Sequence, residues 1–332
     1  MKILIRLPNW LGDVVMSTAF TAAVKEYYPG AEVHVIIKKE LSGIAELIPG
    51  ITIHPFSKQE YKGLSGVYRF GKSLRGEKFD LFFNLPASLS SLVLGWATGA
   101  NKRIGFAKEG GMFLLNNAYK MPDELHRVDQ YLYLLEQFTG KPVTERKVGI
   151  DIYLEHEPAH NIVMVNFNSE ATSRRMPEEK AKRLLSVLAE AFPDVQFGLI
   201  GSPKEKPYVD SLIPVDNVRS DGYPRFLNYA GKTNLPQLAG YMANATAILT
   251  TDSGPAHLAN AVGRPTIVLF GAGDEHNTAP YNKENLTIIR AGKLACEPCV
   301  KNTCKLYGVP KCMELLDELQ IINALSVYLR HA

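Results

Sequence analysis

Short apolar runs alternate with helical hydrophobic patterns along the first half of the chain. The apolar runs span residues 3–7, 32–37, 51–54 and 79–85, and the clearest helical patterns between them span 14–27 and 41–47. Strands that alternate with helices are typical of parallel βαβ units with right-handed crossovers. We therefore expect an α/β fold built on a parallel sheet.

The pattern thins at residues 141–158, where prolines and charged residues separate the apolar blocks, and then resumes. The second series has predicted strands at 162–167, 196–200, 226–229, 247–250 and 266–270, with helices at 178–192, 235–242 and 255–262. We therefore predict two Rossmann-like domains, residues 1–155 and 156–312. Residues 313–332 are predicted to add an amphipathic helix, most regular over 314–329, that packs on either domain.

Length and composition agree with two folded domains. The chain has 332 residues, of which 46% are hydrophobic and 21% charged, and one domain typically takes roughly 100–200 residues. The uncharged stretch 81–101 contains Asn, Pro, Ser and Gly, which favours a buried strand and helix over a membrane span. Arg6 and Pro8 interrupt the first apolar run, which disfavours a secretory signal. We expect a cytoplasmic protein, and we expect any contact with a membrane to be peripheral.

The net charge of +3 is unevenly distributed. Residues 1–150 carry 19 Lys and Arg against 14 Asp and Glu, and most of this excess lies between Ile36 and Gly110. An anionic membrane or an acidic partner would meet that stretch favourably. An ordinary solvated helix surface would have the same composition, so both interpretations stay open.

Three loops at the carboxyl ends of predicted strands are the first places to look for a site. The first, residues 9–13, contains Gly12, which allows close backbone approach, and Asp13, which begins a helix. Asp13 is either a functional carboxylate or a residue favoured there by the helix dipole. Because the loop lacks G-x-G-x-x-G, we do not expect a dinucleotide on the first domain.

The second and third loops belong to the second domain. Adjacent Arg174 and Arg175 precede a predicted helix and are either diphosphate ligands or exposed surface charges. In the third loop, Asp252 could accept hydrogen bonds from sugar hydroxyls, and Gly254 permits close approach to free amides at the helix start. His257 lies one turn further on, and this combination indicates a ligand site.

All four cysteines lie in one segment, Cys296-x2-Cys299-x4-Cys304-x7-Cys312. Four thiolates at this spacing could surround one structural Zn²⁺, although a labile disulfide and free thiols stay open. The chain has no D-x-D pair, P-loop or G-x-S-x-G, which disfavours a P-loop ATPase or a serine hydrolase.

Taken together, Leu11-Gly12-Asp13, Arg174-Arg175-Met176-Pro177, the block 251–257 and the cysteine segment resemble glycosyltransferase family 9. The resemblance implies the GT-B architecture, with an acceptor on the first Rossmann-like domain, an ADP-sugar on the second and an interdomain cleft. It implies inverting transfer of heptose from ADP-heptose to the inner core of lipopolysaccharide, with no cofactor required for catalysis.

The resemblance also implies roles for individual residues. Asp13 matches the general base, which removes a proton from the acceptor hydroxyl as the diphosphate leaves. The expected donor-binding residues are Arg174, Arg175, Lys232, Asp252, Ser253, Gly254 and His257. The expected acceptor-binding residues are Gly12 and Arg103.

Three alternatives are carried beside this hypothesis. Met176 stands where the family often has Trp, so a related glycosyltransferase with another nucleotide sugar is one of them. A binding protein for a sugar nucleotide or a glycolipid that lost catalysis is the second. The third is a zinc-stabilised nucleic-acid binder. The chain lacks the interleaved aromatic and basic residues of a single-strand groove, so we expect no nucleic-acid partner.

Overall fold

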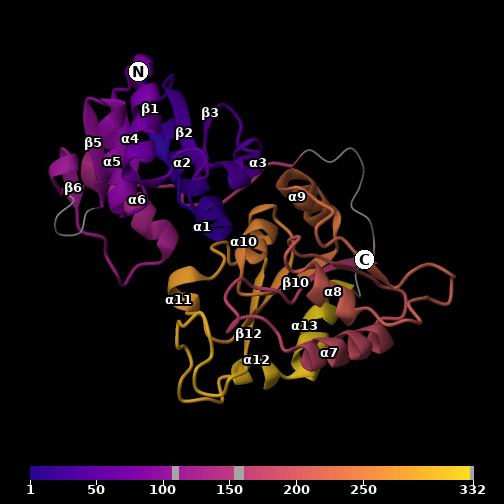
Figure 1. The fold of residues 1–332 in the computed structure, drawn as a ribbon. Coiled ribbons are helices and arrows are strands. Elements are labelled where there is room, and N and C mark those ends of the chain that lie inside the picture. Colours follow the sequence, from indigo (N-terminus) through magenta and orange to yellow (C-terminus); the bar gives the residue numbers. More distant parts are fainter. Residues whose placement is uncertain (107–111, 153–160, 330–332) are drawn as a thin grey trace. The chain divides into compact units, whose positions relative to one another are not determined.

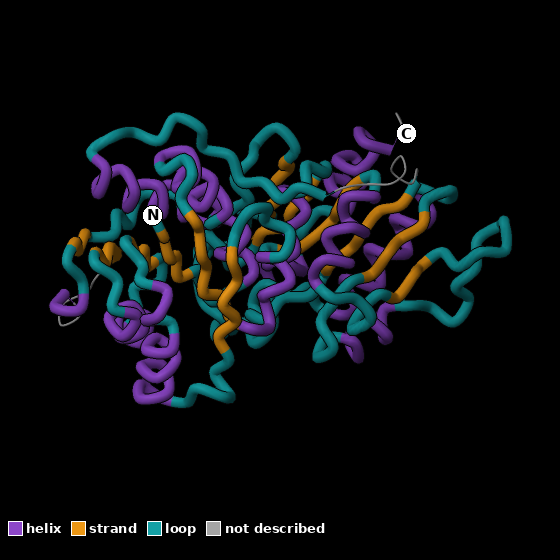
Figure 2. Tube along the Cα trace, turned by 90° about the horizontal axis from the view of Figure 1, so that it is seen from above, coloured by secondary structure: helices purple, strands orange, loops and turns teal. Residues whose placement is uncertain are grey.

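The computed structural model describes residues 1–106, 112–152 and 161–329. The chain divides into two compact units, Met1–Asp151 and Ile152–Ala332, each with its own sheet and core. The boundary predicted between residues 155 and 156 lies outside the described residues. Figure 1 shows the elements of both units, and Figure 2 shows the strands of each sheet side by side among the helices.

The first unit has a six-stranded parallel sheet in the order β3-β2-β1-β4-β5-β6. Its strands are β1 (Lys2–Arg6), β2 (Glu32–Lys38), β3 (Thr52–Phe56), β4 (Leu81–Asn84), β5 (Lys102–Phe106) and β6 (Asn117–Tyr119). Its α-helices are α1 (Leu11–Met16), α2 (Thr18–Tyr27), α3 (Ser42–Ala45), α4 (Gly63–Ser73), α5 (Leu89–Thr98) and α6 (Arg127–Thr139), and its 3-10 turns are η1 (Lys39–Leu41), η2 (Arg75–Glu77) and η3 (Met112–Leu114).

The second unit repeats this arrangement, with a parallel sheet in the order β12-β11-β10-β7-β8-β9. Its strands are β7 (Ile162–Asn166), β8 (Gln196–Leu199), β9 (Phe226–Asn228), β10 (Ala247–Thr251), β11 (Thr266–Phe270) and β12 (Leu286–Arg290). Its helices are α7 (Glu178–Ala191), α8 (Lys206–Leu212), α9 (Leu235–Asn244), α10 (Gly254–Ala261), α11 (Glu275–Thr278), α12 (Lys311–Glu314) and α13 (Glu318–Leu329). The predicted α/β class with two Rossmann-like sheets is confirmed.

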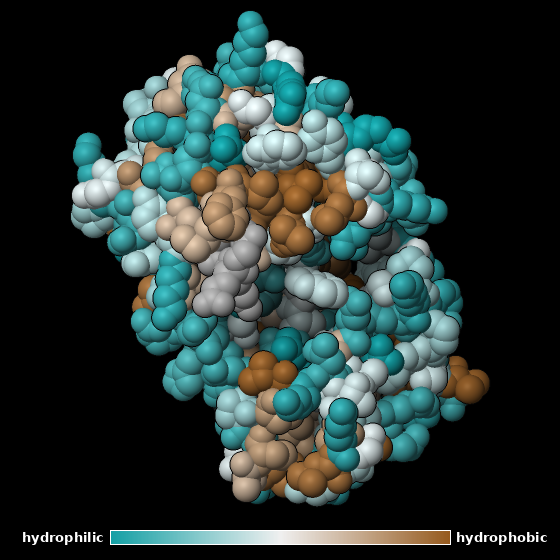
Figure 3. Space-filling model, turned by 60° about the vertical axis from the view of Figure 1, so that its left-hand side comes forward, coloured by the Kyte–Doolittle hydropathy of each residue, from teal (hydrophilic) through white to brown (hydrophobic). Residues whose placement is uncertain are grey.

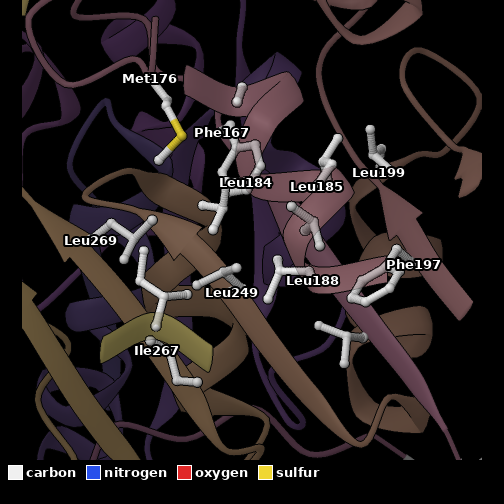
Figure 4. Packing of buried hydrophobic residues seen from close by; sticks show 14 of the residues in the cluster. Phe167, Met176, Leu184, Leu185, Leu188, Phe197, Leu199, Leu249, Ile267 and Leu269 are labelled. Carbon is white, nitrogen blue, oxygen red and sulfur yellow. The ribbon is translucent and has the colours of Figure 1, made fainter. Parts of the chain in front are cut away.

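The central strands are continuous apolar runs because parallel sheets are covered on both faces. Val163 and Val165 of β7 and Leu249 of β10 are almost fully buried, and Leu184 and Leu188 of α7 pack against them (Figure 4). At about 25 cal/mol per Å² of buried apolar surface, such side chains supply the main stabilisation of each unit.

The end of the chain differs from the prediction. The single helix expected over 314–329 is two helices, since α12 ends at Glu314 and α13 begins at Glu318. The side chain of Asp317 accepts a hydrogen bond of 2.9 Å from the amide of Leu319 and starts the second helix there. Ile321 and Leu325 are buried in the core of the second unit, so α13 packs on that unit.

The first predicted helix is also divided. Helical structure begins at Leu11 rather than at residue 14, and Ser17 separates α1 from α2. The hydroxyl of Ser17 donates a hydrogen bond of 2.7 Å to the carbonyl of Val14, a local bond that competes with regular helix geometry. Asp13 is therefore the third helical residue and not the first.

Candidate active site

In each unit the strand order reverses between the two central strands, β1 and β4 in the first and β7 and β10 in the second. Ligands of open α/β sheets bind outside the carboxyl ends of the strands at such reversals. Asp13 follows β1, and Asp252 follows β10 directly. Each unit therefore presents one of the predicted carboxylates at its own reversal point.

The carboxylate of Asp13 is held by two side chains of α6. The hydroxyl of Tyr131 donates to Oδ1 across 3.3 Å, and Nε of Arg127 lies 3.5 Å from the same oxygen. Burial raises the pKa of Asp13, while the charge of Arg127 and the hydrogen bond from Tyr131 oppose that rise. The side chain is 25% exposed, so this carboxylate is oriented yet accessible to a ligand.

Arg103 does not share the surroundings of Asp13. It is the second residue of β5, and its guanidinium donates 2.9 Å hydrogen bonds to the carbonyls of Leu114 and Ala100. Those bonds tie the guanidinium to the backbone on either side of β5. The cation beside Asp13 is Arg127, which sequence analysis missed. The i, i+4 spacing of Arg127 and Tyr131 places both on one face of a helix, but it does not indicate that this face meets Asp13.

In the second unit, Asp252 is buried and faces Arg174. The Nη1 atom of Arg174 lies 3.3 Å from Oδ2 of Asp252, and Oδ2 has no hydrogen-bond partner among the described residues. Burial raises the pKa of Asp252 to about 6, although Arg174 and Arg290 both favour the charged form. The pair is a buried acceptor with a partly exposed cation, which suits a polar ligand carrying negative charge.

The loop after β11, residues 271–274, closes over Asp252. A Cβ atom added to Gly273 would lie 1.8 Å from Oδ2 of Asp252. Arg290, at the end of β12, holds this loop by donating to the carbonyl of Gly273 across 2.5 Å and by bonding Glu275. Asp252 is therefore enclosed by backbone that cannot carry a side chain at position 273.

Replacing Gly273 with Ala is expected to lower the free energy of unfolding of the second unit by about 1–3 kcal/mol, because overpacking displaces either the loop or the carboxylate. Urea unfolding followed by circular dichroism measures the change. Gly240→Ala is the matched control, since Gly240 lies inside α9 with open space around its added Cβ. That control should stabilise by about 0.5–1 kcal/mol. A Gly273→Ala protein as stable as the wild type would contradict the close approach.

Some of the other residues predicted to bind the nucleotide sugar lie beside Asp252, and others make different contacts. Ser253 precedes α10, and its hydroxyl accepts a hydrogen bond of 2.9 Å from Asn166 at the end of β7. Gly254 opens α10, and His257 is buried one turn further along the same helix. These three residues therefore stand beside Asp252 at the reversal point.

Arg175 and Lys232 are not brought to Asp252. The guanidinium of Arg175 lies over the ring of Tyr208, 5.6 Å from its centroid, and donates to the carbonyl of Ser169. Lys232 follows the edge strand β9, which lies three strands from β10, or roughly 14 Å at the usual strand spacing. Arg174 is the cation that the loop directs at the carboxylate.

The cysteine segment braces the loops around Arg174 and Gly273. The amide of Ser173 donates to the carbonyl of Asn302 across 3.1 Å, and the amide of Val300 donates to that of Ala272 across 2.8 Å. All four cysteines are free and line one cavity of about 20 Å³. Burial and nearby Glu297 raise the pKa of Cys312 to about 11.

The predicted zinc site is not supported by this geometry. In residues 1–106, 112–152 and 161–329, no group of three or more His, Cys, Asp or Glu side chains is arranged to hold a metal ion. The observed contribution of Cys296, Cys299, Cys304 and Cys312 is to line the cavity beside the two loops.

Comparisons with a family model and with known proteins indicate the same family. Residues 67–309 match the model of glycosyltransferase family 9 (heptosyltransferase). A lipooligosaccharide heptosyltransferase 2 of Haemophilus influenzae is 29% identical over 315 residues, covering 87% of this chain and 88% of that protein. Lipopolysaccharide heptosyltransferase 2 of Escherichia coli is 26% identical over 312 residues, covering 85% of this chain and 86% of that protein.

Two solved structures have a similar fold. The structure of E. coli ADP-heptose LPS heptosyltransferase II has a TM-score of 0.80 at 22% identity and covers 100% of this chain and 99% of that one. A glycosyltransferase family 9 protein from Veillonella parvula has a TM-score of 0.84 at 18% identity, covering 100% and 98%. At these identities the likeness shows the fold alone.

Proposed function

This chain belongs to glycosyltransferase family 9, and we propose that it transfers heptose from ADP-heptose to the inner core of lipopolysaccharide with inversion at the anomeric carbon. The relatives named heptosyltransferase 2 align over most of their length with this chain, which supports the reaction and the substrate class. The first unit would bind the acceptor and the second the nucleotide sugar.

The observation that carries the mechanism is the environment of Asp13. Its pKa is raised, so it is a stronger base than an exposed carboxylate, while Arg127 favours its ionised form. In the proposed step, Asp13 accepts the proton of the acceptor hydroxyl as that oxygen forms a bond to the anomeric carbon. The bond from that carbon to the diphosphate oxygen breaks, and ADP leaves with the bonding electrons.

The second unit would stabilise the departing charge and hold the sugar. Arg174 supplies a cation, and the first turn of α10 supplies backbone amides beside Gly254. Asp252 would accept hydrogen bonds from heptose hydroxyls, as a carboxylate can. We propose that these groups carry the reaction without a metal ion, at the cytoplasmic face of the inner membrane.

Product analysis tests this proposal. Purified protein is incubated with ADP-heptose and an inner-core acceptor that lacks the terminal heptose, and mass spectrometry follows the addition of one heptose. We expect one addition per acceptor, an inverted anomeric configuration by NMR and an unchanged rate with EDTA. Transfer from another nucleotide sugar in preference to ADP-heptose would identify a related glycosyltransferase. Binding of ADP-heptose with no product would indicate the non-catalytic alternative.

A further inference from the structure

The outer surface of α4 and α5 carries apolar side chains that the proposed chemistry does not use. Leu64 of α4 is 50% exposed, and Leu89 and Trp96 of α5 are 52% and 45% exposed. Turn η3, which contacts α5, adds Phe113 at 90% exposure. Figure 3 brings this side of the first unit forward and shows apolar side chains gathered at its surface.

These side chains form one surface because the two helices pack very closely. A Cβ atom on Gly71 of α4 would lie 2.5 Å from the carbonyl oxygen of Leu94 of α5. The rings of Tyr68 and Trp96 meet across the helix pair with centroids 5.6 Å apart. We call this surface, formed by Leu64, Tyr68, Leu89, Trp96 and Phe113, the α4–α5 face.

The charge beside the α4–α5 face is of one sign. Residues 61–76 contain four basic and no acidic residues, and α5 carries no charge at all. Glu60 and Glu77, which flank this segment, form ion pairs with basic residues outside it. Glu60 pairs with Lys39 at 2.9 Å, and Glu77 pairs with Lys2 at 2.8 Å. Within the described residues, no carboxylate forms an ion pair with the four basic side chains of 61–76.

We propose that the α4–α5 face is the surface by which this protein docks on an anionic lipid bilayer. Half-exposed leucines and a tryptophan enter the headgroup boundary, while adjacent lysines and arginines attract anionic headgroups. No helix within the described residues is long and apolar enough to cross a membrane. The inference rests on the proposed function for its purpose, which is to bring the enzyme to a glycolipid acceptor.

A second copy of this chain fits the face less well. In a two-fold symmetric dimer the same surface meets itself, so the four basic residues of 61–76 would face four more with no carboxylate between them. Like charges placed together at an interface oppose association. A surface of anionic headgroups supplies the opposite charge.

Flotation with lipid vesicles tests the docking surface. The wild type should float with vesicles of phosphatidylglycerol and phosphatidylethanolamine at low salt, and should be released by high salt or by replacing the lipid with phosphatidylcholine. Failure of the wild type to float with the anionic vesicles would overturn the proposal.

The double variant Leu64→Ser with Leu89→Ser measures how much the apolar side chains contribute to vesicle binding. We expect it to weaken the affinity for anionic vesicles about tenfold or more. Val215→Ser with Leu319→Ser removes two exposed apolar side chains from the second unit and should bind like the wild type. If both double variants lost the same amount of vesicle affinity, the assignment of the α4–α5 face would be overturned. Unchanged thermal melting of each pair shows that folding is intact.

The double variant Lys62→Gln with Lys72→Gln measures how much the basic side chains contribute to vesicle binding. Each basic residue near an anionic surface contributes about fivefold, so we expect roughly 30-fold weaker binding to anionic vesicles. Lys141→Gln with Lys147→Gln changes the net charge of the same unit equally and should have a much smaller effect. If both pairs lose affinity equally, binding follows net charge and the α4–α5 face is not the contact.

A spectroscopic measurement locates the contact directly. The chain has two tryptophans, so Trp10→Phe leaves Trp96 as the only one. Its fluorescence should shift to shorter wavelength with anionic vesicles and be quenched by brominated lipid. Quenching no stronger than in solution would place Trp96 outside the bilayer and overturn the proposal.

Two further experiments distinguish membrane docking from a dimer interface and from a failure of the proposed function. A dimer in sedimentation equilibrium that Leu64→Ser with Leu89→Ser dissociates would make the face a protein interface and overturn membrane docking. With a water-soluble, delipidated acceptor, that variant should keep the wild-type turnover. If the wild type transfers no heptose to any acceptor, the proposed function fails, whereas the flotation result stands by itself.

Discussion

Asp13→Asn is expected to lower kcat by about 10²–10⁴-fold, the range that one positioned general base contributes. Asn keeps the shape of the side chain and its contact with Tyr131 but cannot accept the proton of the acceptor hydroxyl. Binding of ADP-heptose should be unchanged, because Asp13 lies in the unit that we propose for the acceptor. Steady-state kinetics and isothermal titration calorimetry measure the two quantities separately.

The matched control is Asp123→Asn, which neutralises an exposed carboxylate of the same unit and should keep wild-type turnover. Arg127→Gln gives a second readout, because it removes the charge that lowers the pKa of Asp13. The acidic limb of the pH profile of kcat/KM should then move to higher pH. Wild-type kcat in Asp13→Asn would exclude Asp13 as the base.

Asp252→Asn has the second largest expected effect, and its stability and its activity should change in opposite directions. Turnover should fall about 100-fold, because a charged acceptor of sugar hydroxyls is lost, yet the second unit should gain stability at pH 7.5. The pKa of this carboxyl is about 6 when folded, against 3.8 in the unfolded chain. The folded state thus holds an extra proton between about pH 4 and 6, and stability falls as pH rises through that window.

Above pH 6 the penalty for the buried charge reaches about 3 kcal/mol. Urea unfolding should therefore show Asp252→Asn to be more stable than the wild type by about 1–3 kcal/mol at pH 7.5, with a smaller difference at pH 4.5. Arg174→Gln should have the opposite effect at pH 7.5, since it removes a charge that favours ionised Asp252. A less stable Asp252→Asn at both pH values would contradict this account.

The two carboxylates were predictable because each lies beyond the carboxyl end of a strongly apolar strand, where parallel sheets place their ligands. Asp252 directly follows β10, and Asp13 lies in the helix that follows β1. Their partners were predictable to different degrees. Arg174 lies in the loop after β7, the strand paired with the one before Asp252. Arg127 reaches Asp13 from α6, more than a hundred residues away, and only the packing of α6 against α1 brings them together.

The directions in which several predicted site residues point could not be read from the sequence. Residue type gives the chemistry of Arg103, Arg175 and the cysteines but not the direction in which each side chain points. The guanidinium of Arg103 donates to two backbone carbonyls, and that of Arg175 lies over a tyrosine ring. Sequence spacing brought the four thiols to one cavity, as the fold shows, but it could not distinguish a zinc site from free thiols.

The position of α13 has a consequence for synthesis on the ribosome. The first unit is complete at Asp151 and can fold while the rest of the chain is still being translated. The second core includes Ile321 and Leu325, and α13 contacts α7, so this core stays incomplete until nearly the whole message has been read. A premature stop codon before α13 would therefore release a polypeptide with one finished half and one open half, which is the form that chaperones and proteases recognise.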